Sequence, residues 1–318
     1  MNISEAINRI INDENLWNEF SENGMREVKN YYTWKAHVDS YINEVEKIAG
    51  IRKDEEKVFT QVGRKMLDVE KLIVSDIDHT LLGDDNALTE FIDHLNNAHS
   101  KVGFAVATGR TVDSAFNVLK ENNVPFPDII ISSVGAEIYY NYHGRLIYAS
   151  GWDAHIKHQW KREKIKRLLA DFDFLQYQEE ATQRKYKISY YTSDVPEYLE
   201  KVKSILIQNK IRANVIFSHG QYLDILPYRA SKGKAIRYLA YRWNIPYENI
   251  LVAGDSGNDR EMLKGDLLGV VVANYSSELE SLKGQNRIYF AKRKYAGGIV
   301  DGIDHYHFLK LKQETPVG

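Results

Sequence analysis

Six short runs of apolar residues limit most strongly how this chain can fold. They read KLIVSDI, VGFAVAT, DIIISSVG, NILVAGD, LGVVVAN and RIYF. Amphipathic helices lie between them, the first with Leu88, Phe91, Ile92 and Leu95 on one face. Continuous apolar strands separated by helices are typical of a parallel sheet that helices cover on both faces. The sequence therefore predicts an α/β fold built on a doubly wound parallel sheet.

Residues 151–226 interrupt this rhythm. The stretches YKISYYT and QYLDILP alternate polar and apolar residues, as half-exposed antiparallel strands do. Helical patterns cover residues 157–170 and 196–209. We therefore expect a small α+β domain at 151–226, inserted into a core formed by residues 69–150 and 227–318.

Residues 1–68 have a different pattern, with Val38, Tyr41, Ile42 and Val45 at helical spacing and charges on the other faces. The N-terminus lacks the apolar core of a signal peptide, and no window approaches the ~18 apolar residues of a membrane span. We expect a helical extension on a soluble, cytoplasmic protein that does not bind membranes.

Composition removes several classes of function. The chain has no cysteine, which excludes disulfides, thiolate metal sites and cysteine nucleophiles. Its 44 acidic and 42 basic residues nearly cancel, so net charge gives no argument for binding nucleic acid.

Eight residues with reactive or phosphate-binding potential stand at strand ends or at the start of a helix. They are Asp76 and Asp78 after KLIVS, Thr108, Gly109 and Arg110 after VGFAVA, Lys232 in SKGKA, and Asp255 and Asp259 after ILVA. Ligands of open parallel sheets bind beyond the carboxyl ends of the strands. We therefore expect these residues to share one site.

The four aspartates predict a site for one divalent cation. Asp76, Asp78, Asp255 and Asp259 supply the hard oxygen ligands that Mg²⁺ prefers, and the charge of the ion offsets the repulsion between neighbouring carboxylates. Asp76 can then attack phosphorus as a nucleophile. Asp78 can protonate the leaving oxygen and later activate water.

The remaining residues suit the binding of a phosphoryl group. The Thr108 hydroxyl and the backbone N–H groups near Gly109 can hold phosphoryl oxygens. Lys232 adds positive charge where negative charge develops during transfer. We therefore predict that Asp76, Asp78, Thr108 and Lys232 are catalytic.

The motifs DIDHT, ATGRT, SKGKA and GDSGND resemble those of haloacid-dehalogenase-like (HAD) phosphatases. The resemblance implies that Asp76 is the nucleophile and Asp78 the acid and base. It also implies an α+β cap domain (C2 type) over the site, inserted between the second and third motifs, where residues 151–226 lie.

The stretches SSVGAEIYYN, KYKISYYTS and GQYLDILPYRASKGKAIRYL resemble sucrose-6-phosphate phosphatases from about residue 70 almost to the C-terminus. Carried over from that family, the substrate-binding residues are Gly135, Glu137 and Lys187, with Asp224 near the junction of cap and core. Two residues depart from the family: His79 replaces a common asparagine, and position 136 is alanine rather than a polar residue.

The stretch LWNEFSENGMREVKNYYTWKAHVDSYINEVEKI resembles the last helices of sucrose-phosphate synthases, family-4 glycosyltransferases that are often fused to such phosphatases. About 65 residues of helix cannot form a nucleotide-sugar site, so we expect no synthase activity. Three interpretations stay open: a relic that packs on the phosphatase, a dock for a separate synthase, or the remainder of a longer fusion.

The leading prediction is a Mg²⁺-dependent phosphatase that converts sucrose 6-phosphate to sucrose through an aspartyl-phosphate. One alternative keeps the chemistry with another substrate, such as mannosylfructose phosphate or sugar phosphates in general. A second is a non-catalytic partner of a sucrose-phosphate synthase, against which the retained aspartates and Lys232 argue. A phosphomutase would need a phosphate dock in the cap, and no arginine cluster there supplies one.

Overall fold

The computed structural model describes residues 3–28, 33, 38, 62–63, 65–98 and 101–310. It divides into two units, Met1–Gln61 and Val62–Gly318. Within the described part of the first unit lie the helices α1 (Ile3–Ile11) and α2 (Glu14–Glu27), and the Asp13 side chain caps α2 by accepting from Leu16 N. Most of the helical pattern predicted around Tyr41 lies outside the described residues.

The second unit contains an eight-stranded sheet in the order β12-β11-β10-β1-β2-β3-β4-β5. The strands are β1 (Lys71–Ser75), β2 (Val102–Ala107), β3 (Ile129–Ser132), β4 (Glu137–Tyr142), β5 (Arg145–Tyr148), β10 (Ile250–Gly254), β11 (Leu268–Val271) and β12 (Ile288–Phe290). Pairing is parallel from β12 to β3 and antiparallel from β3 to β5. The predicted parallel sheet is confirmed, with an antiparallel edge that the apolar pattern did not indicate.

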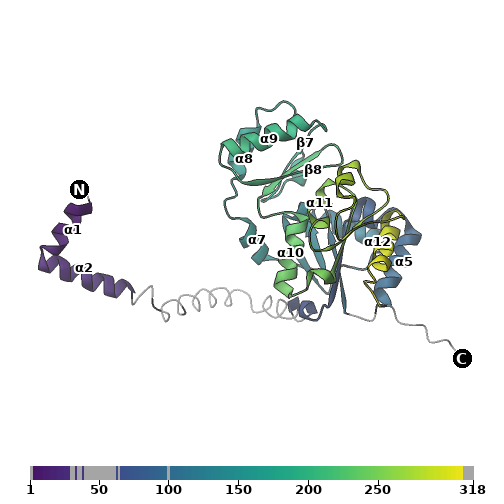
Figure 1. Ribbon diagram of the computed structural model, residues 1–318, viewed down its shortest axis with the longest axis horizontal. Coiled ribbons are helices and arrows are strands. Elements are labelled where there is room, and N and C mark those ends of the chain that lie inside the picture. Colours follow the sequence, from purple (N-terminus) through teal and green to yellow (C-terminus); the bar gives the residue numbers. More distant parts are fainter. Residues whose placement is uncertain are drawn as a thin grey trace. The chain divides into compact units, whose positions relative to one another are not determined.

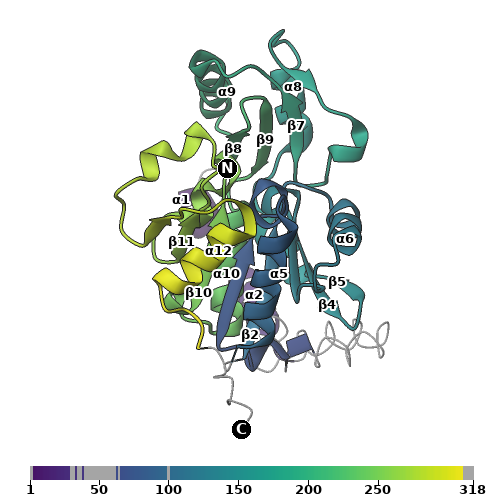
Figure 2. The ribbon, with the colours of Figure 1, turned by 90° about the vertical axis from the view of Figure 1, so that its right-hand side faces the viewer.

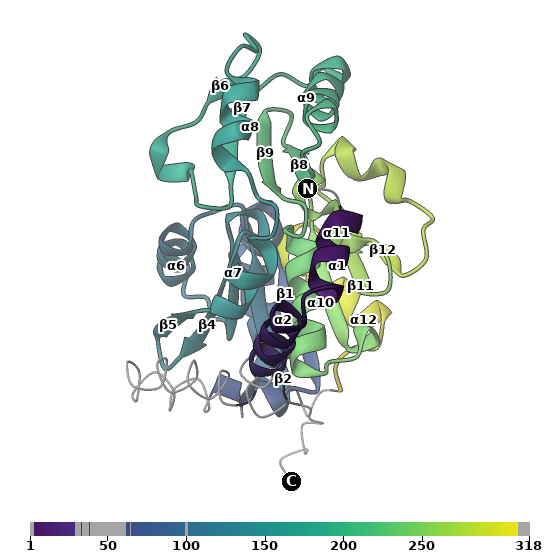
Figure 3. The same ribbon diagram turned by 90° about the vertical axis from the view of Figure 1, so that its left-hand side faces the viewer.

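Helices cover both faces of this sheet, as expected for buried apolar strands. They are α5 (Asp85–Asn96), α6 (Val112–Glu121), α7 (Ser150–Ile156), α10 (Lys232–Trp243), α11 (Arg260–Leu263) and α12 (Tyr295–His305). Figure 2 shows α5 and α12 on one face, and Figure 3 shows α7 and α10 on the other. Strand alternation explains the two cores: Ile73 packs with Phe91 and Ile299, whereas Leu72 and Val74 face the opposite side.

A second sheet, with four antiparallel strands, falls in the insertion predicted at 151–226 apart from its last residue. Its order is β6-β7-β9-β8, from β6 (Gln176–Tyr177), β7 (Ile188–Tyr191), β8 (Ala213–Ser218) and β9 (Tyr222–Pro227). Helices α8 (Arg162–Leu169) and α9 (Pro196–Gln208) pack on it (Figure 1). We call this sheet with α8 and α9 the cap, and the eight-stranded sheet with its helices the core.

Alternation along the cap strands gives this sheet two different faces. Leu223 and Ile225 of β9 pack into the apolar cluster with α8 and α9. Asp224, between them, therefore points to the other face. The same argument applies to Ser189 between Ile188 and Tyr190 on β7. The cap thus buries one apolar face under its helices and carries polar side chains on the other.

The predicted fold class, an α/β core with an α+β insertion, is confirmed. The exact domain boundaries that we placed at residues 68, 150 and 226 stay predictions. Among the described residues, no helix is both long and apolar enough to cross a membrane.

Candidate active site

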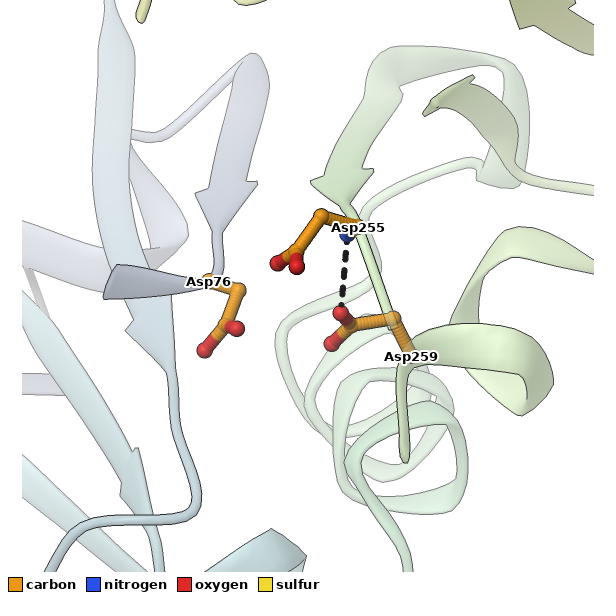
Figure 4. A group of neighbouring side chains, drawn as sticks. All are labelled: Asp76, Asp255 and Asp259. Carbon is orange, nitrogen blue, oxygen red and sulfur yellow. Dashed lines mark hydrogen bonds between the residues drawn. The ribbon is translucent and has the colours of Figure 1, made fainter. Parts of the chain in front are cut away.

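Three carboxylates meet where β1 and β10 end. The two strands pair in parallel, with Ser75 opposite Ala253, so the residues that follow them emerge at the same edge of the sheet. Asp76, Asp255 and Asp259 each place one oxygen so that all three atoms lie within 4.8 Å of one another. Figure 4 shows the three side chains converging from two separate segments of the chain.

The turn after β10 explains how Asp259 returns to the end of the strand. Its Oδ2 accepts from the backbone N–H groups of Asp255 at 3.0 Å and Ser256 at 3.1 Å. Gly254 permits this approach, because a Cβ there would lie only 2.5 Å from the Asp259 Cβ. Ser256 and Asp259 form a capping box at the start of η6 (Gly257–Asp259), which fixes the loop.

Lys232, the first residue of α10, lies fully buried between two of these carboxylates. Its Nζ is 2.9 Å from Asp76 Oδ1 and 2.7 Å from Asp259 Oδ1. Burial opposes the charged amine, but the neighbouring carboxylates outweigh it and raise the pKa of Lys232 well above its usual value. Lys232 is therefore a fixed positive charge beside the candidate nucleophile.

Burial also acts on the carboxylates. It raises the pKa of Asp76 well above its usual value, against the lowering effect of Lys232. Burial and the charge of Asp259 raise the pKa of Asp255 to about 7, although Thr80 donates to Asp255 Oδ1 at 2.8 Å. Too much negative charge is enclosed for one lysine to neutralise, which favours a cation at this point.

The donor set fits a hard divalent cation. Within the described part of the chain, three buried side-chain oxygens have no hydrogen-bond partner, and two of them, Asp76 Oδ1 and Asn258 Oδ1, belong to residues that line a cavity between core and cap. The first meets Lys232 only as an ion pair. Carboxylate and amide oxygens without donors are ligands that Mg²⁺ accepts.

The carboxylate of Asp78 does not join the other three. It belongs to the turn η2 (Ile77–Leu81), and Arg110 donates to both its oxygens, from Nε at 2.8 Å and from Nη2 at 2.7 Å. Three of the four predicted carboxylates therefore lie together, the Asp78 side chain lies on Arg110, and a role of Asp78 as a metal ligand stays a prediction. The sequence placed Arg110 among the residues at this strand end but assigned it no role; the structure shows it as the partner of Asp78.

Thr108 follows β2 and is fully buried. Its N–H donates to Ile131 O at 2.8 Å, and its Oγ1 accepts from Arg110 N at 3.1 Å. The next residue, Gly109, lies on the wall of the cavity. The second motif therefore reaches the same site as the aspartates, as the strand order requires.

A cavity of about 650 Å³ lies between core and cap. Most of the residues that line it have polar side chains. From the core come Asp76, Asp78, His79, Gly109, Arg110, Thr111, Ser114 and Asn258, and from the cap and its connections Gln178, Ala181, Thr182, Lys187, Ser218, His219, Gln221, Tyr222 and Asp224. A polar ligand that spans both walls would fill it. The sequence pattern did not indicate His219 or the two glutamines, and it marked His79 only as a departure from the family.

Two of the four predicted substrate-binding residues line this cavity, and two do not. Lys187 Nζ lies 3.4 Å from Asp224 Oδ1, both side chains are nearly buried, and Ser189 donates to Asp224 at 2.6 Å. Gly135 and Glu137, which the structure also describes, do not line this cavity.

The structure gives Gly135 and Glu137 other contacts. Gly135 has φ +92°, and a Cβ there would lie 2.2 Å from the carbonyl carbon of Ser231. Glu137 accepts from the hydroxyls of Ser132 and Ser133 and lies 3.8 Å from Arg184. Both stabilise the packing around the site, and a direct contact of either with substrate stays a prediction.

Comparison with known proteins agrees with this geometry. Residues 69–307 match the family model "Sucrose-6F-phosphate phosphohydrolase". A solved sucrose-phosphatase from Synechocystis sp. PCC6803, in complex with sucrose and phosphate, superposes with a TM-score of 0.72 and 32% identity, over 76% of this chain and 100% of that one. A HAD-like hydrolase from Bacillus subtilis, 19% identical, shares the fold with a TM-score of 0.56, over 76% of this chain and 94% of that one.

Two curated relatives show the range of the similarity. Probable sucrose-phosphatase 2 of Arabidopsis thaliana is 32% identical over 251 residues, 74% of this chain and 59% of that protein. The chain therefore spans less than two thirds of the length of such plant relatives. Mannosylfructose-phosphate phosphatase of Agrobacterium fabrum is 30% identical over 241 residues, 74% of this chain and 96% of that protein.

Proposed function

The chain belongs to the sucrose-6F-phosphate phosphohydrolase family, and from that premise we propose that it is a Mg²⁺-dependent phosphatase acting on sucrose 6-phosphate. The observation that carries the proposal is the convergence of Asp76, Asp255 and Asp259 beside Lys232, where Asp76 lines a cavity between core and cap.

The first step that we propose is attack by an Asp76 carboxylate oxygen on the phosphorus of the bound ester. The bond between phosphorus and the sugar oxygen breaks, Asp78 protonates that oxygen, and the phosphoryl group remains on Asp76. Water then attacks phosphorus, Asp78 takes its proton, and the bond to Asp76 breaks to release phosphate. For this role Asp78 must turn away from Arg110, which holds both its oxygens in this structure.

The other residues of the site have electrostatic roles in this proposal. Asp76, Asp255 and Asp259 would hold the Mg²⁺, which supplies positive charge against the phosphoryl oxygens. Lys232 adds a fixed charge beside Asp76, and Thr108 with the N–H of Gly109 binds the phosphoryl group from the second motif. The Lys187–Asp224 pair faces the sugar from the cap wall.

The test is phosphate release from a panel of sugar phosphates with Mg²⁺ and after chelation by EDTA. We expect sucrose 6-phosphate to have the highest kcat/KM, and chelation to abolish release. Retained activity in EDTA would contradict the metal role. A flat profile across the panel would contradict the substrate.

A second substrate has its own support. The mannosylfructose-phosphate phosphatase is 30% identical to this chain over 96% of its own length. Mannosylfructose phosphate therefore belongs in the panel. A higher kcat/KM for it than for sucrose 6-phosphate would favour this alternative.

The family match begins at residue 69, so the helical extension lies outside it. We propose that residues 1–68 bind a sucrose-phosphate synthase, in line with their resemblance to its last helices. Co-purification of a synthase with the full chain, and not with residues 69–318, would support this.

A further inference from the structure

The turn between β8 and β9 carries part of the cavity wall. Ser218, His219, Gln221 and Tyr222 of this cap hairpin all line the cavity. His219 has φ +52° and Gly220 has φ +68°, so the two adjacent residues adopt the left-handed conformation. Their backbone N–H groups point out of the hairpin, toward the core.

One core carboxylate receives both of these N–H groups. Glu278, in the short helix η7 (Ser277–Leu282), accepts from His219 N and from Gly220 N, each at 3.3 Å. Its Oε2 also accepts from Gly257 N at 2.7 Å and from the Ser276 hydroxyl at 2.9 Å. A single side chain therefore joins the cap hairpin to the loop that carries Asp255 and Asp259.

The packing around Gly257 shows how closely these segments approach. A Cβ on Gly257 would lie 2.4 Å from the carbonyl oxygen of Phe217 in the hairpin and 2.8 Å from Glu278 Oε2. The start of η7 is held from the other side, because Ser276 N donates to the carbonyl oxygen of Asp255 at 2.7 Å. The carboxylate thus stands on a segment that is itself anchored to the candidate metal-binding loop.

We propose that Glu278 is a positioning residue for the reaction: it fixes the cap hairpin on the loop of Asp255 and Asp259 and thereby sets the distance between the sugar-facing and phosphate-facing walls of the cavity. This inference rests on the proposed function, because it concerns the binding of a substrate that spans both walls. A misplaced wall weakens the binding of such a substrate, whereas a small ester that occupies only the phosphate end is less affected.

Replacing Glu278 with glutamine disturbs the hydrogen bonds that hold the cap hairpin, with little change in the shape of the side chain. The carboxylate presents acceptors on both oxygens, Oε1 to Gly220 N and Oε2 to the other three donors. A glutamine must turn its NH₂ group toward one of these sides, where it meets N–H groups instead of acceptors. Asp259 keeps its bonds to Asp255 N and Ser256 N, so the metal-binding loop is expected to survive.

The matched control is Glu280→Gln, in the same short helix. Glu280 is exposed, pairs with Lys283 and accepts from the Tyr275 hydroxyl, and touches neither hairpin nor metal-binding loop in any described contact. Both variants are measured in the full chain with sucrose 6-phosphate and with p-nitrophenyl phosphate. Amide hydrogen exchange is followed in peptides that cover 217–222 and 102–107.

For Glu278→Gln we expect KM for sucrose 6-phosphate to rise about tenfold or more, the loss typical of hydrogen bonds to a charged group. Kinetic constants for p-nitrophenyl phosphate change less than about threefold, and exchange accelerates in 217–222 but not in 102–107. Glu280→Gln behaves like wild type. Glu278→Asp, which keeps the charge on a shorter side chain, gives intermediate exchange and serves if the glutamine variant does not fold.

Two results would overturn the proposal. One is unchanged exchange in 217–222 in the Glu278 variants. The other is faster exchange in both peptides with equal losses on both substrates, which marks a role in stability alone. If the wild-type protein does not prefer sugar phosphates, that result contradicts the proposed substrate and not the role of Glu278. The exchange comparison needs no substrate and still decides whether Glu278 holds the hairpin.

Discussion

Arg110 donates to both carboxylate oxygens of Asp78, from Nε to Oδ2 at 2.8 Å and from Nη2 to Oδ1 at 2.7 Å. Such a two-bond pair is among the strongest that side chains form, and it directs the Asp78 carboxylate to Arg110. An acid in phosphoryl transfer must carry a proton and face the leaving oxygen. In the mechanism that we propose, the pair between Arg110 and Asp78 has to open before Asp78 can act as the acid.

Asp78→Asn is expected to lower kcat by an amount that depends on how much the leaving group needs a proton. Protonation of a sugar alkoxide contributes about 10² to 10⁴ in rate, whereas p-nitrophenolate leaves without a proton. Sucrose 6-phosphate hydrolysis should therefore fall by at least about 10²-fold, and p-nitrophenyl phosphate hydrolysis far less. Equal losses on the two substrates would contradict the acid role, with thermal unfolding as the check that the variant folds.

Asp76→Asn is expected to abolish turnover of every phosphate ester, by about 10³-fold or more, because no other group can take the phosphoryl group. The fold should persist, since asparagine has nearly the same shape and Lys232 keeps Asp259. Phosphate release is compared with that of Asp85→Asn, an exposed aspartate on α5. A phosphorylated Asp76 trapped by rapid acid quench in wild type, and absent in Asp76→Asn, would identify the nucleophile directly.

The convergence of the aspartates was predictable because it follows from sheet topology. Parallel strands β1 and β10 end at one edge, so the residues after them must meet, and the apolar runs located both strands correctly. The direction of the Asp78 side chain was not predictable. It depends on the turn at His79, where φ is +56°, and on an arginine 32 residues away.

The cavity walls likewise contain some residues whose position the sequence predicted and others whose position it did not. The alternating pattern of QYLDILP placed Asp224 on one face of a strand, and it lies on the cavity side. The sequence did not indicate Glu278, because three of its four hydrogen-bond donors are backbone N–H groups 21, 58 and 59 residues away, which have no side-chain signature. The sequence did single out Gly135, but only the structure shows why a glycine is needed there: a Cβ would collide with the backbone of Ser231.

Lys187→Ala is expected to raise KM for sucrose 6-phosphate about tenfold while changing p-nitrophenyl phosphate kinetics little. Lys187 is nearly buried on the cap wall and its only described ionic partner is Asp224, so its ammonium group is placed to bind sugar hydroxyls together with that carboxylate. Lys185→Ala is the control, since Lys185 is two residues away and 69% exposed. Equal losses on both substrates, or a loss in the control, would count against the sugar contact.

The stability of the metal-free protein should fall as pH rises, in a way that Mg²⁺ suppresses. Burial and Asp259 raise the pKa of Asp255 from the ordinary 3.8 to about 7. The folded state therefore holds this proton more tightly than the unfolded state. Its contribution to the free energy of unfolding is fully present below pH 3.8 and is lost as pH rises through about 7.

Bound Mg²⁺ removes this loss, because the ion prefers ionised ligands and compensates their charge. Urea unfolding at pH 5.5 and 7.5, with EDTA or with Mg²⁺, should therefore show a larger stabilisation by the metal at the higher pH. In Asp255→Asn, the free energy of unfolding in EDTA should depend less on pH, because the titrating group is gone. Stabilisation by Mg²⁺ should also be smaller, because one proposed ligand is missing. A stabilisation by Mg²⁺ that is equal at both pH values would mean that Asp255 is already ionised in the metal-free protein, and that Lys232 alone balances the three carboxylates.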